Sequence, residues 1–251
     1  MEPEIPKIIH YCWFGQHTLP KEFLKNIESW QKFNPGFNLM FWGNNDLPME
    51  YSYVKNAYLN KKWANLSNFT RLYALKHYGG IYLDTDVISL KSFSPFLNNS
   101  CFLGIESKTN EKIILNNAII GAVKAHFFIN KCFNTLIEKF DGCEAANLSS
   151  PILTTNVFNS LTITDQNKIS IYESDFFYPS NWNSKDKINI TNNSITIHEW
   201  KASWHDEFDH LANKQYLIAI NKFLQNITQN KLNIKYILKF FTTFLRSLTF
   251  S

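Results

Sequence analysis

Apolar positions follow two patterns along this chain, one of which predicts short strands and the other longer helices. Compact apolar runs are typical of buried strands, and they occur at 7–13, 37–42, 81–83, 87–90, 101–105, 118–122, 169–172 and 195–198. Apolar residues three and four positions apart are typical of helices, and they occur at 19–33, near 53, at 63–78, at 126–140 and from 149 onwards. The order strand, helix, strand at the start predicts a parallel βαβ unit. We therefore expect an α/β fold with a central sheet flanked by helices.

The stretch Gly79–Val87 combines a helix end, a strand and two acidic residues. Gly79 suits the left-handed conformation that often ends a helix, and the apolar run after it predicts a buried strand. Asp84 and Asp86 follow that strand with one residue between them. Because side chains at i and i+2 of an extended chain share a face, both carboxylates can reach one cavity.

The spacing of Asp84 and Asp86 predicts a metal site. Two close carboxylates repel each other, and burying them without a partner is costly. Mg²⁺ or Mn²⁺ would remove both penalties and keep positions free for phosphate oxygens. Aspartates at this spacing also occur in surface turns that bind nothing. The position of this pair at the carboxyl end of an apolar strand, where open α/β sheets bind ligands, favours a metal and nucleotide site.

The helix predicted at 63–78 has two unlike faces. One face is large and apolar, and the other holds Ala64, Ser67, Asn68 and Arg71 at spacings of three and four. A solvated face would carry more lysine and glutamate, so we expect a ligand to cover the polar face. The alternative is a solvated Arg71 paired with a carboxylate.

The charge of the chain is concentrated near its end. The net charge of the 251 residues is +4, and six of the 25 basic residues but none of the 21 acidic ones lie in 214–251. Apolar stripes at helical spacing predict two helices there, formed by Leu217, Ile220, Leu224 and Ile227, and then by Ile234, Ile237, Leu238, Phe241 and Leu245. We expect one domain at 1–213 and a basic amphipathic helical tail at 214–251. The tail either makes peripheral contact with an anionic membrane surface or packs its stripes on the domain.

The cysteines and the start of the chain bear on the compartment. The four cysteines show neither CxxC nor zinc-ligand spacing, which favours free thiols in a reducing compartment. The first residues lack the basic and apolar regions of a secretory signal, and no apolar run is long enough to span a bilayer. We expect a cytoplasmic protein, at most peripheral on the inner face of the cytoplasmic membrane, and no nucleic-acid partner.

Four segments together resemble a known enzyme family. They are Ile8–Gly15, Ala64–Arg71, Gly79–Val87 and His198–Trp204. In order and spacing they are similar to the bacterial glycosyltransferases of family 32, which holds the yeast initiating α-1,6-mannosyltransferase and capsular-polysaccharide sugar transferases. More distantly they resemble the glucosylating domains of the large clostridial toxins. The tail lies outside the resemblance.

The resemblance implies a fold, a reaction and a cofactor. The fold is GT-A, a nucleotide-sugar-binding fold with a mixed central sheet. The enzyme would be a hexosyltransferase that uses a nucleotide-sugar donor, most simply a UDP-sugar, together with Mn²⁺ or Mg²⁺, and retains the anomeric configuration. The acceptor would be a growing surface glycan (capsule, O-antigen or lipooligosaccharide) or a lipid-linked glycan.

The resemblance also implies roles for single residues. Trp13 would stack on the base, since an aromatic face accepts any flat base. The other implied nucleotide contacts are His10, Ser67, Asp84, Ser203 and Trp204. The implied donor-sugar contacts are Asn68, Arg71 and Asn117, and the implied metal ligands are Asp84, Asp86 and His198. Asp84, Asp86, Arg71 and Asn68 are expected to carry the reaction.

Asn68 departs from the family pattern, in which an aspartate usually stands in a Ser-Asp-x-x-Arg run. Asparagine keeps one acceptor and adds two donor hydrogens, but it loses the charge. A changed donor sugar, weaker activity and a lapsed catalyst are all compatible with this change. The retained Asp84, Asp86 and Arg71 favour a changed sugar preference.

Three other functions are compatible with parts of the sequence. A nucleotidyltransferase also uses paired aspartates and metal. A lapsed family member would bind sugar, nucleotide or a membrane partner without turnover. An effector that glycosylates host protein would need the same site.

Overall fold

The computed structural model describes residues 4–15, 18–109, 112–180, 188–201, 211, 214–229 and 234–249. The chain divides into two compact units, Met1–Trp200 and Lys201–Ser251. Each unit is described by itself.

The first unit is built on a six-stranded mixed sheet in the order β2-β1-β3-β6-β5-β7. Its strands are β1 (Ile8–Cys12), β2 (Asn38–Trp42), β3 (Gly80–Leu83), β5 (Cys101–Lys108), β6 (Ile113–Ala122) and β7 (Ser170–Tyr172). Strand β1 is parallel to β2 and to β3, whereas β6 is antiparallel to β3 and to β5. The parallel β1–β2 pair, joined through a helix, confirms the predicted βαβ unit, and the sheet is mixed, as the resemblance implied.

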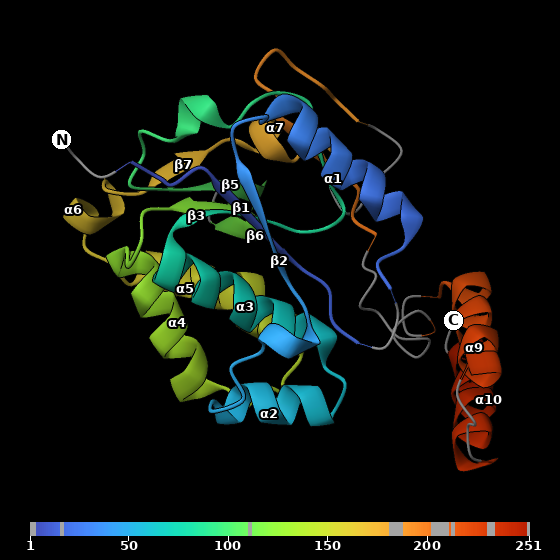
Figure 1. Cartoon of the computed structure of the whole chain (residues 1–251). Coiled ribbons are helices and arrows are strands. Elements are labelled where there is room, and N and C mark those ends of the chain that lie inside the picture. Colours follow the sequence, from blue (N-terminus) through green and yellow to red (C-terminus); the bar gives the residue numbers. More distant parts are fainter. Residues whose placement is uncertain are drawn as a thin grey trace. The chain divides into compact units, whose positions relative to one another are not determined.

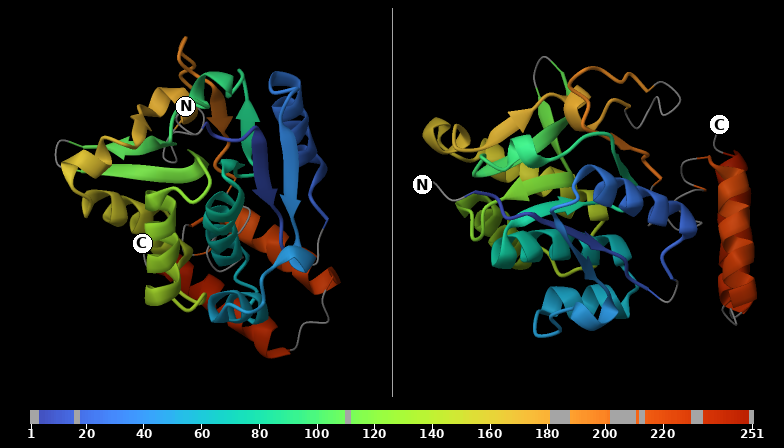
Figure 2. Two further views of the ribbon diagram at one scale, coloured as in Figure 1. Left: turned by 60° about the vertical axis from the view of Figure 1, so that its left-hand side comes forward. Right: turned by 45° about the horizontal axis from the view of Figure 1, so that its top comes forward.

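Helices cover both faces of this sheet (Figure 1). Four helices lie on one face, namely α2 (Ser52–Leu59), α3 (Trp63–Tyr78), α4 (Phe127–Lys139) and α5 (Leu153–Asn159). On the other face lie α1 (Lys21–Phe33) and α7 (Ser174–Phe177), and α6 (Ile163–Gln166) is a short connection before β7. Figure 2 shows the same layers from two further directions.

Each face of the sheet has its own hydrophobic core. One core includes Phe69 of α3 and Phe133 of α4, which are buried against each other. The other includes Trp30 of α1 and Phe177 of α7, together with residues of β3 and β6. The four cysteines are free thiols, as expected, and three of them are buried. The sheet is therefore covered on both sides, and its strand ends are where polar groups gather.

Two glycines set the path from α3 into β3. Gly79 has φ +67° and Gly80 has φ +105°, which side chains other than glycine rarely adopt. A Cβ atom on Gly79 would lie 2.6 Å from the backbone nitrogen of Lys124, and one on Gly80 would lie 2.7 Å from the carbonyl oxygen of Ile8. The helix therefore ends at the predicted glycine, and the strand that follows is drawn close to β1.

A separate two-stranded ribbon is formed by β4 (Val87–Ser89) and β8 (Thr196–His198), which are antiparallel with Val87 opposite His198. The backbone groups of Asp86 and Leu90 face β8, where they pair with Glu199 and Ile195. In an antiparallel strand the intervening residues turn their backbone groups the other way. The carbonyl oxygens of Thr85 and Val87 and the N–H of Ser89 face α1.

Three side chains of α1 bond to that side of β4. Asn26 donates to the carbonyl oxygen of Thr85 (3.0 Å), and the Trp30 Nε1 donates to the carbonyl oxygen of Val87 (2.8 Å). The Ser29 Oγ accepts from the backbone N–H of Ser89 (2.9 Å). Strand β4 is thus held by β8 on one side and by side chains of α1 on the other.

The second unit contains two helices, α9 (Tyr216–Gln229) and α10 (Ile234–Thr249). Their shared core consists of Leu211, Ala219, Phe223 and Phe240, and the rings of Phe223 and Phe240 stack with centroids 3.8 Å apart. Among the described residues, no helix combines the length and apolar character needed to cross a bilayer.

The two helices predicted in 214–251 are present, and their apolar stripes are partly packed and partly exposed within this unit. Ile220 and Ile237 pack against the core of the unit, as a stripe should. Much of the remaining stripe is exposed instead, namely Leu217, Leu224, Ile227, Ile234, Leu238, Phe241 and Leu245. The reason is that the two helices pack through Ala219, Phe223 and Phe240, which lie beside the predicted stripes.

Candidate active site

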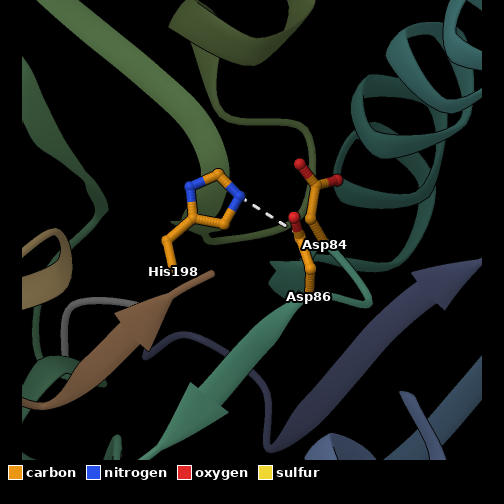
Figure 3. Close-up of side chains that lie close together, drawn as sticks. All are labelled: Asp84, Asp86 and His198. Carbon is orange, nitrogen blue, oxygen red and sulfur yellow. Dashed lines mark hydrogen bonds and ion pairs between the residues drawn. The ribbon is translucent and has the colours of Figure 1, made fainter. Parts of the chain in front are cut away.

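Three potential metal ligands converge where the sheet meets the ribbon. Asp84 follows β3, Asp86 precedes β4, and His198 is the last residue of β8. One ligand atom from each lies within 4.8 Å of the others. Figure 3 shows the His198 ring pointing toward the carboxylates, with its Nε2 3.1 Å from the Asp86 Oδ1. Residues 112 positions apart in sequence are thus brought into contact.

The charges at this point are only partly shielded from solvent. The side chain of Asp84 is 27% exposed, that of Asp86 14% and that of His198 8%. Burial by itself would lower the pKa of His198, but Asp86, Asp84 and Glu106 together raise it. A cluster that draws a proton onto a buried imidazole also attracts other cations. Two carboxylates and one imidazole are a donor set that fits a divalent transition-metal ion.

Arg71 joins this cluster from α3. Its Nη2 donates to the Asp84 Oδ1 at 3.0 Å, its Nη1 donates to the Ser150 Oγ at 3.2 Å, and its guanidinium carbon lies 4.9 Å from the ring centroid of Tyr82. Burial opposes the charge of Arg71, but neighbouring Asp84 raises its pKa. Within the described residues, the buried Nε has no hydrogen-bond partner. The buried arginine therefore keeps one donor for a ligand. The alternative of a solvated Arg71 paired with a carboxylate is wrong in its solvation, because Arg71 is buried, but its pairing with a carboxylate is confirmed.

Asn68 contacts the chain itself. Its Nδ2 donates to the carbonyl oxygen of Ala146 (2.9 Å) and to the Ser149 Oγ (3.0 Å), and the residue is buried. The carbonyl oxygen can only accept, so the amide nitrogen must face it. The chain itself therefore contacts the polar face of α3 at this point through the amide nitrogen of Asn68, and the expected contact of Asn68 with a donor sugar stays a prediction. Residues 146–150 cover Asn68 and reach Arg71.

Two more buried polar groups lie near the cluster. Asn117 of β6 donates from its Nδ2 to the Thr154 Oγ1 (2.6 Å), while its buried Oδ1 has no partner among the described residues. The buried hydroxyl of Tyr178 likewise has no partner in the described part of the chain. Burial and then Asp84 raise the pKa of Tyr178, so its hydroxyl stays protonated. Unpaired buried groups of this kind are rare and need an explanation, such as a missing ligand.

The residues expected at the base and ribose lie along β1 and the start of α3. Trp13 is half-buried just after β1, with its ring 5.3 Å from that of Phe23. The Ser67 hydroxyl donates back to the carbonyl oxygen of Trp63 (3.1 Å). The His10 Nε2 donates to the carbonyl oxygen of Gly79 (2.8 Å), and its Nδ1 accepts from Trp42 (3.3 Å). Both nitrogens of the buried His10 ring are thus used inside the protein. Any part it has in nucleotide binding would be indirect.

Two of the predicted site residues, Ser203 and Trp204, lie outside the described residues. The others fall into one group around Asp84 and a second group along β1. Their roles as ligands of metal, base or sugar stay predictions.

The structure adds residues that the sequence did not single out. Tyr178 and Trp200 pack around the His198 ring, with centroids 5.9 and 4.1 Å from it. Glu106 accepts from the Asn116 Nδ2 (2.8 Å), and burial raises its pKa. The sequence signal for Glu106 is its position at the end of an apolar run in β5, because a carboxylate buried there needs a partner.

The part of the chain that contains several of these residues matches a known protein family. Residues 20–103 match the family described as "Glycosyltransferase sugar-binding region containing DXD motif". This range holds Asn68, Arg71, Asp84 and Asp86. The matched range also contains the Asp-x-Asp sequence of this chain at 84–86.

Similar proteins support the same assignment. The chain is 29% identical over 212 residues to an uncharacterized glycosyltransferase of Acanthamoeba polyphaga mimivirus, covering 80% of this chain and 84% of that protein. It is 26% identical over 137 residues to a mannosyl phosphorylinositol ceramide synthase of Saccharomyces cerevisiae, covering 53% of this chain but only 35% of the yeast protein. The fold is similar to that of the UDP-bound glycosyltransferase domain from the YGT toxin, with a TM-score of 0.53, 10% identity, and coverage of 85% and 87%. The chain is thus similar to glycosyltransferases in sequence and in fold, and its residues 20–103 match the DXD-containing sugar-binding region.

Proposed function

We propose that the chain transfers a hexose from a UDP-sugar to a glycan or a lipid-linked glycan, with a divalent cation and with retention of configuration, in the manner of family 32. The observation that carries this proposal is the meeting of Asp84, Asp86, His198 and Arg71 at one point. The YGT toxin domain of similar fold is UDP-bound in its solved structure, which supports the choice of nucleotide.

The metal would be held by Asp84, Asp86 and His198. The mixed oxygen and nitrogen donor set favours Mn²⁺ over Mg²⁺, which prefers oxygen ligands alone. When bound, the cation supplies positive charge beside the two phosphates of the donor. The hydrogen bond between Asp86 and His198 keeps these two ligands together before any cation arrives.

Arg71 would supply a second positive charge to the leaving nucleoside diphosphate. Its guanidinium is fixed by Asp84, Ser150 and the ring of Tyr82, so little reorganisation is needed during transfer. The unpaired oxygen of Asn117 and the hydroxyl of Tyr178 are suited to hydroxyl groups of the donor sugar. Trp13 would stack on the uracil.

Attack by the acceptor hydroxyl from the same face as the leaving phosphate accounts for retention. In this route the leaving phosphate takes the acceptor proton, so the enzyme needs no nucleophile. For the acceptor, the name of the yeast relative points to a lipid-linked substrate. We propose a cytoplasmic reaction, with the basic tail close to the membrane that carries such a substrate.

The test is nucleoside-diphosphate release from a panel of nucleotide sugars by the purified full-length chain with Mn²⁺. We expect UDP from at least one donor and none in EDTA. Asp86→Ala should lower the rate at least about 100-fold. The matched control is Asp165→Ala, because the side chain of Asp165 is partly exposed and bonds to Lys168 and Thr162 of its own segment. The anomeric configuration of the product, read by NMR, tests retention.

The same assay tests the other functions. Pyrophosphate in place of UDP would mean a nucleotidyltransferase. Binding of UDP by calorimetry without turnover of any donor would mean a lapsed enzyme. Full activity of wild type in EDTA would refute the metal site.

A further inference from the structure

One buried side chain of α1 contacts both segments that carry the metal ligands. The Asn26 Nδ2 donates to the carbonyl oxygen of Thr85 (3.0 Å) and to the Glu199 Oε2 (2.9 Å). Thr85 stands between Asp84 and Asp86, and Glu199 follows His198 directly. Both hydrogens of one amide group therefore join the two segments.

The two hydrogen bonds of Asn26 lie where the ribbon of β4 and β8 ends. The last backbone bond of the ribbon on this side runs from the Glu199 N–H to the carbonyl oxygen of Asp86 (2.9 Å). The short strands leave few other bonds to fix the distance between Asp86 and His198. Asn26 adds a second connection across the same two segments, through Thr85 on one and Glu199 on the other.

Neighbouring side chains of α1 make a different kind of contact. Ser29 and Trp30 bond to Ser89 and Val87, which lie on β4 alone. Loss of these bonds would loosen β4 from α1 without separating β4 from β8. Asn26, in contrast, bonds to both segments.

We propose that Asn26 is a positioning residue for the metal site, which holds His198 at the distance from Asp84 and Asp86 that a shared cation requires. This inference rests on the proposed function, because it needs a metal at these three residues. Removing a residue that orients metal ligands without contacting the metal typically changes the metal affinity about 10–100-fold. Asn26 has the contacts for that role and is itself out of reach of solvent, with 4% of its surface exposed.

The test is the affinity for Mn²⁺ of the full chain, measured without turnover by titration of the electron paramagnetic resonance signal of free Mn²⁺, alone and with UDP. Asn26→Ala should raise the dissociation constant about tenfold. Asn26→Leu, which fills the same space without hydrogen bonds, should do the same and serves if the alanine variant folds poorly. Saturating Mn²⁺ should restore most of kcat in both variants, because the ligands themselves are intact.

Ser29→Ala is the matched control. It removes a hydrogen bond between α1 and β4 one turn along the helix, and it should lower thermal stability while changing Mn²⁺ affinity less than about twofold, because it touches only one of the two segments. Unchanged affinity in the Asn26 variants would overturn the inference, as would an equal loss in Ser29→Ala. Failure of the wild type to bind Mn²⁺ would instead refute the metal site of the proposed function, and the inference with it.

Discussion

Replacing Asn68 by aspartate restores the residue usual in the family, yet the structure predicts that it destabilises this chain. The amide of Asn68 supplies two hydrogens, one to the carbonyl oxygen of Ala146 and one to the Ser149 Oγ. A carboxylate supplies none. The Ser149 hydroxyl, which now donates to Ala146 (3.2 Å), would have one hydrogen for two acceptors.

The magnitude follows from these contacts. One hydrogen bond is worth about 1 kcal/mol net, and a buried acceptor left without a donor costs about 1–3 kcal/mol. We therefore expect a loss of about 3 kcal/mol in the free energy of unfolding. In a unit of this size this loss lowers Tm by about 6–12 °C.

The assay is urea and thermal unfolding of wild type and Asn68→Asp at pH 7 and at pH 5. In the unfolded chain an aspartate has a pKa of about 3.9, and burial in the folded chain should raise the pKa of this carboxylate. The unfolded state then ionises first, so the deficit is complete at pH 7 and shrinks as the pH falls toward about 4. The control is Asn60→Asp, where an exposed amide donates to the carbonyl oxygen of Asn56 (2.8 Å) and the cost should be below about 1 kcal/mol.

An Asn68→Asp variant as stable as wild type at pH 7 would refute this reasoning. An altered donor preference without loss of stability would instead support the interpretation drawn from the family pattern, in which this position contacts the sugar.

Three further changes have outcomes fixed by single contacts. Burial and then Lys168 lower the pKa of His126 to about 4. The free energy of unfolding should therefore be highest above about pH 6.5 and fall by up to about 3 kcal/mol as the pH drops toward about 4. His126→Asn, which keeps the helix cap, should remove this pH dependence in urea unfolding experiments. Gly121→Ala would place a Cβ 2.0 Å from the Cε1 of Phe102 and should lower the free energy of unfolding by about 1–3 kcal/mol. Adding Phe102→Leu should recover part of this loss in the double variant. Equal Tm values for wild type and Gly121→Ala would contradict this prediction. Arg71→Lys keeps the charge but loses the fork geometry, and kcat/KM should fall about 100-fold, whereas an unchanged value would exclude a role in transfer.

Much of the sheet and its flanking helices could be predicted from the sequence. The helix at 63–78 has the predicted bounds, because its apolar face and Gly79 mark its length and its end. The two carboxylates lie close together as predicted, but through a turn and not through the period of two of a strand, because residues 85 and 86 form a turn in which the Val87 N–H donates to the carbonyl oxygen of Asp84 (3.1 Å). These are local properties, in which sequence neighbours determine the outcome.

Long-range contacts could not be predicted from the residues alone. His198 was assigned to the metal only through the family resemblance, since nothing in its own surroundings indicates contact with Asp86. Asn26 lies among the apolar residues of α1, which indicates a buried partner but does not say which one. Phe223 and Phe240 stack because each helix of the second unit faces the other, and neither stripe specifies that pairing.

The contacts between α1 and β4 have a consequence for association between molecules. A strand with one open side offers a template to which another chain can add a strand, and natural proteins cover or block such sides. Here Asn26 and Trp30 bond to the carbonyl oxygens of Thr85 and Val87, and Ser29 accepts from the N–H of Ser89. The side of β4 that faces away from β8 is therefore closed to strand addition and to the aggregation that can follow from it.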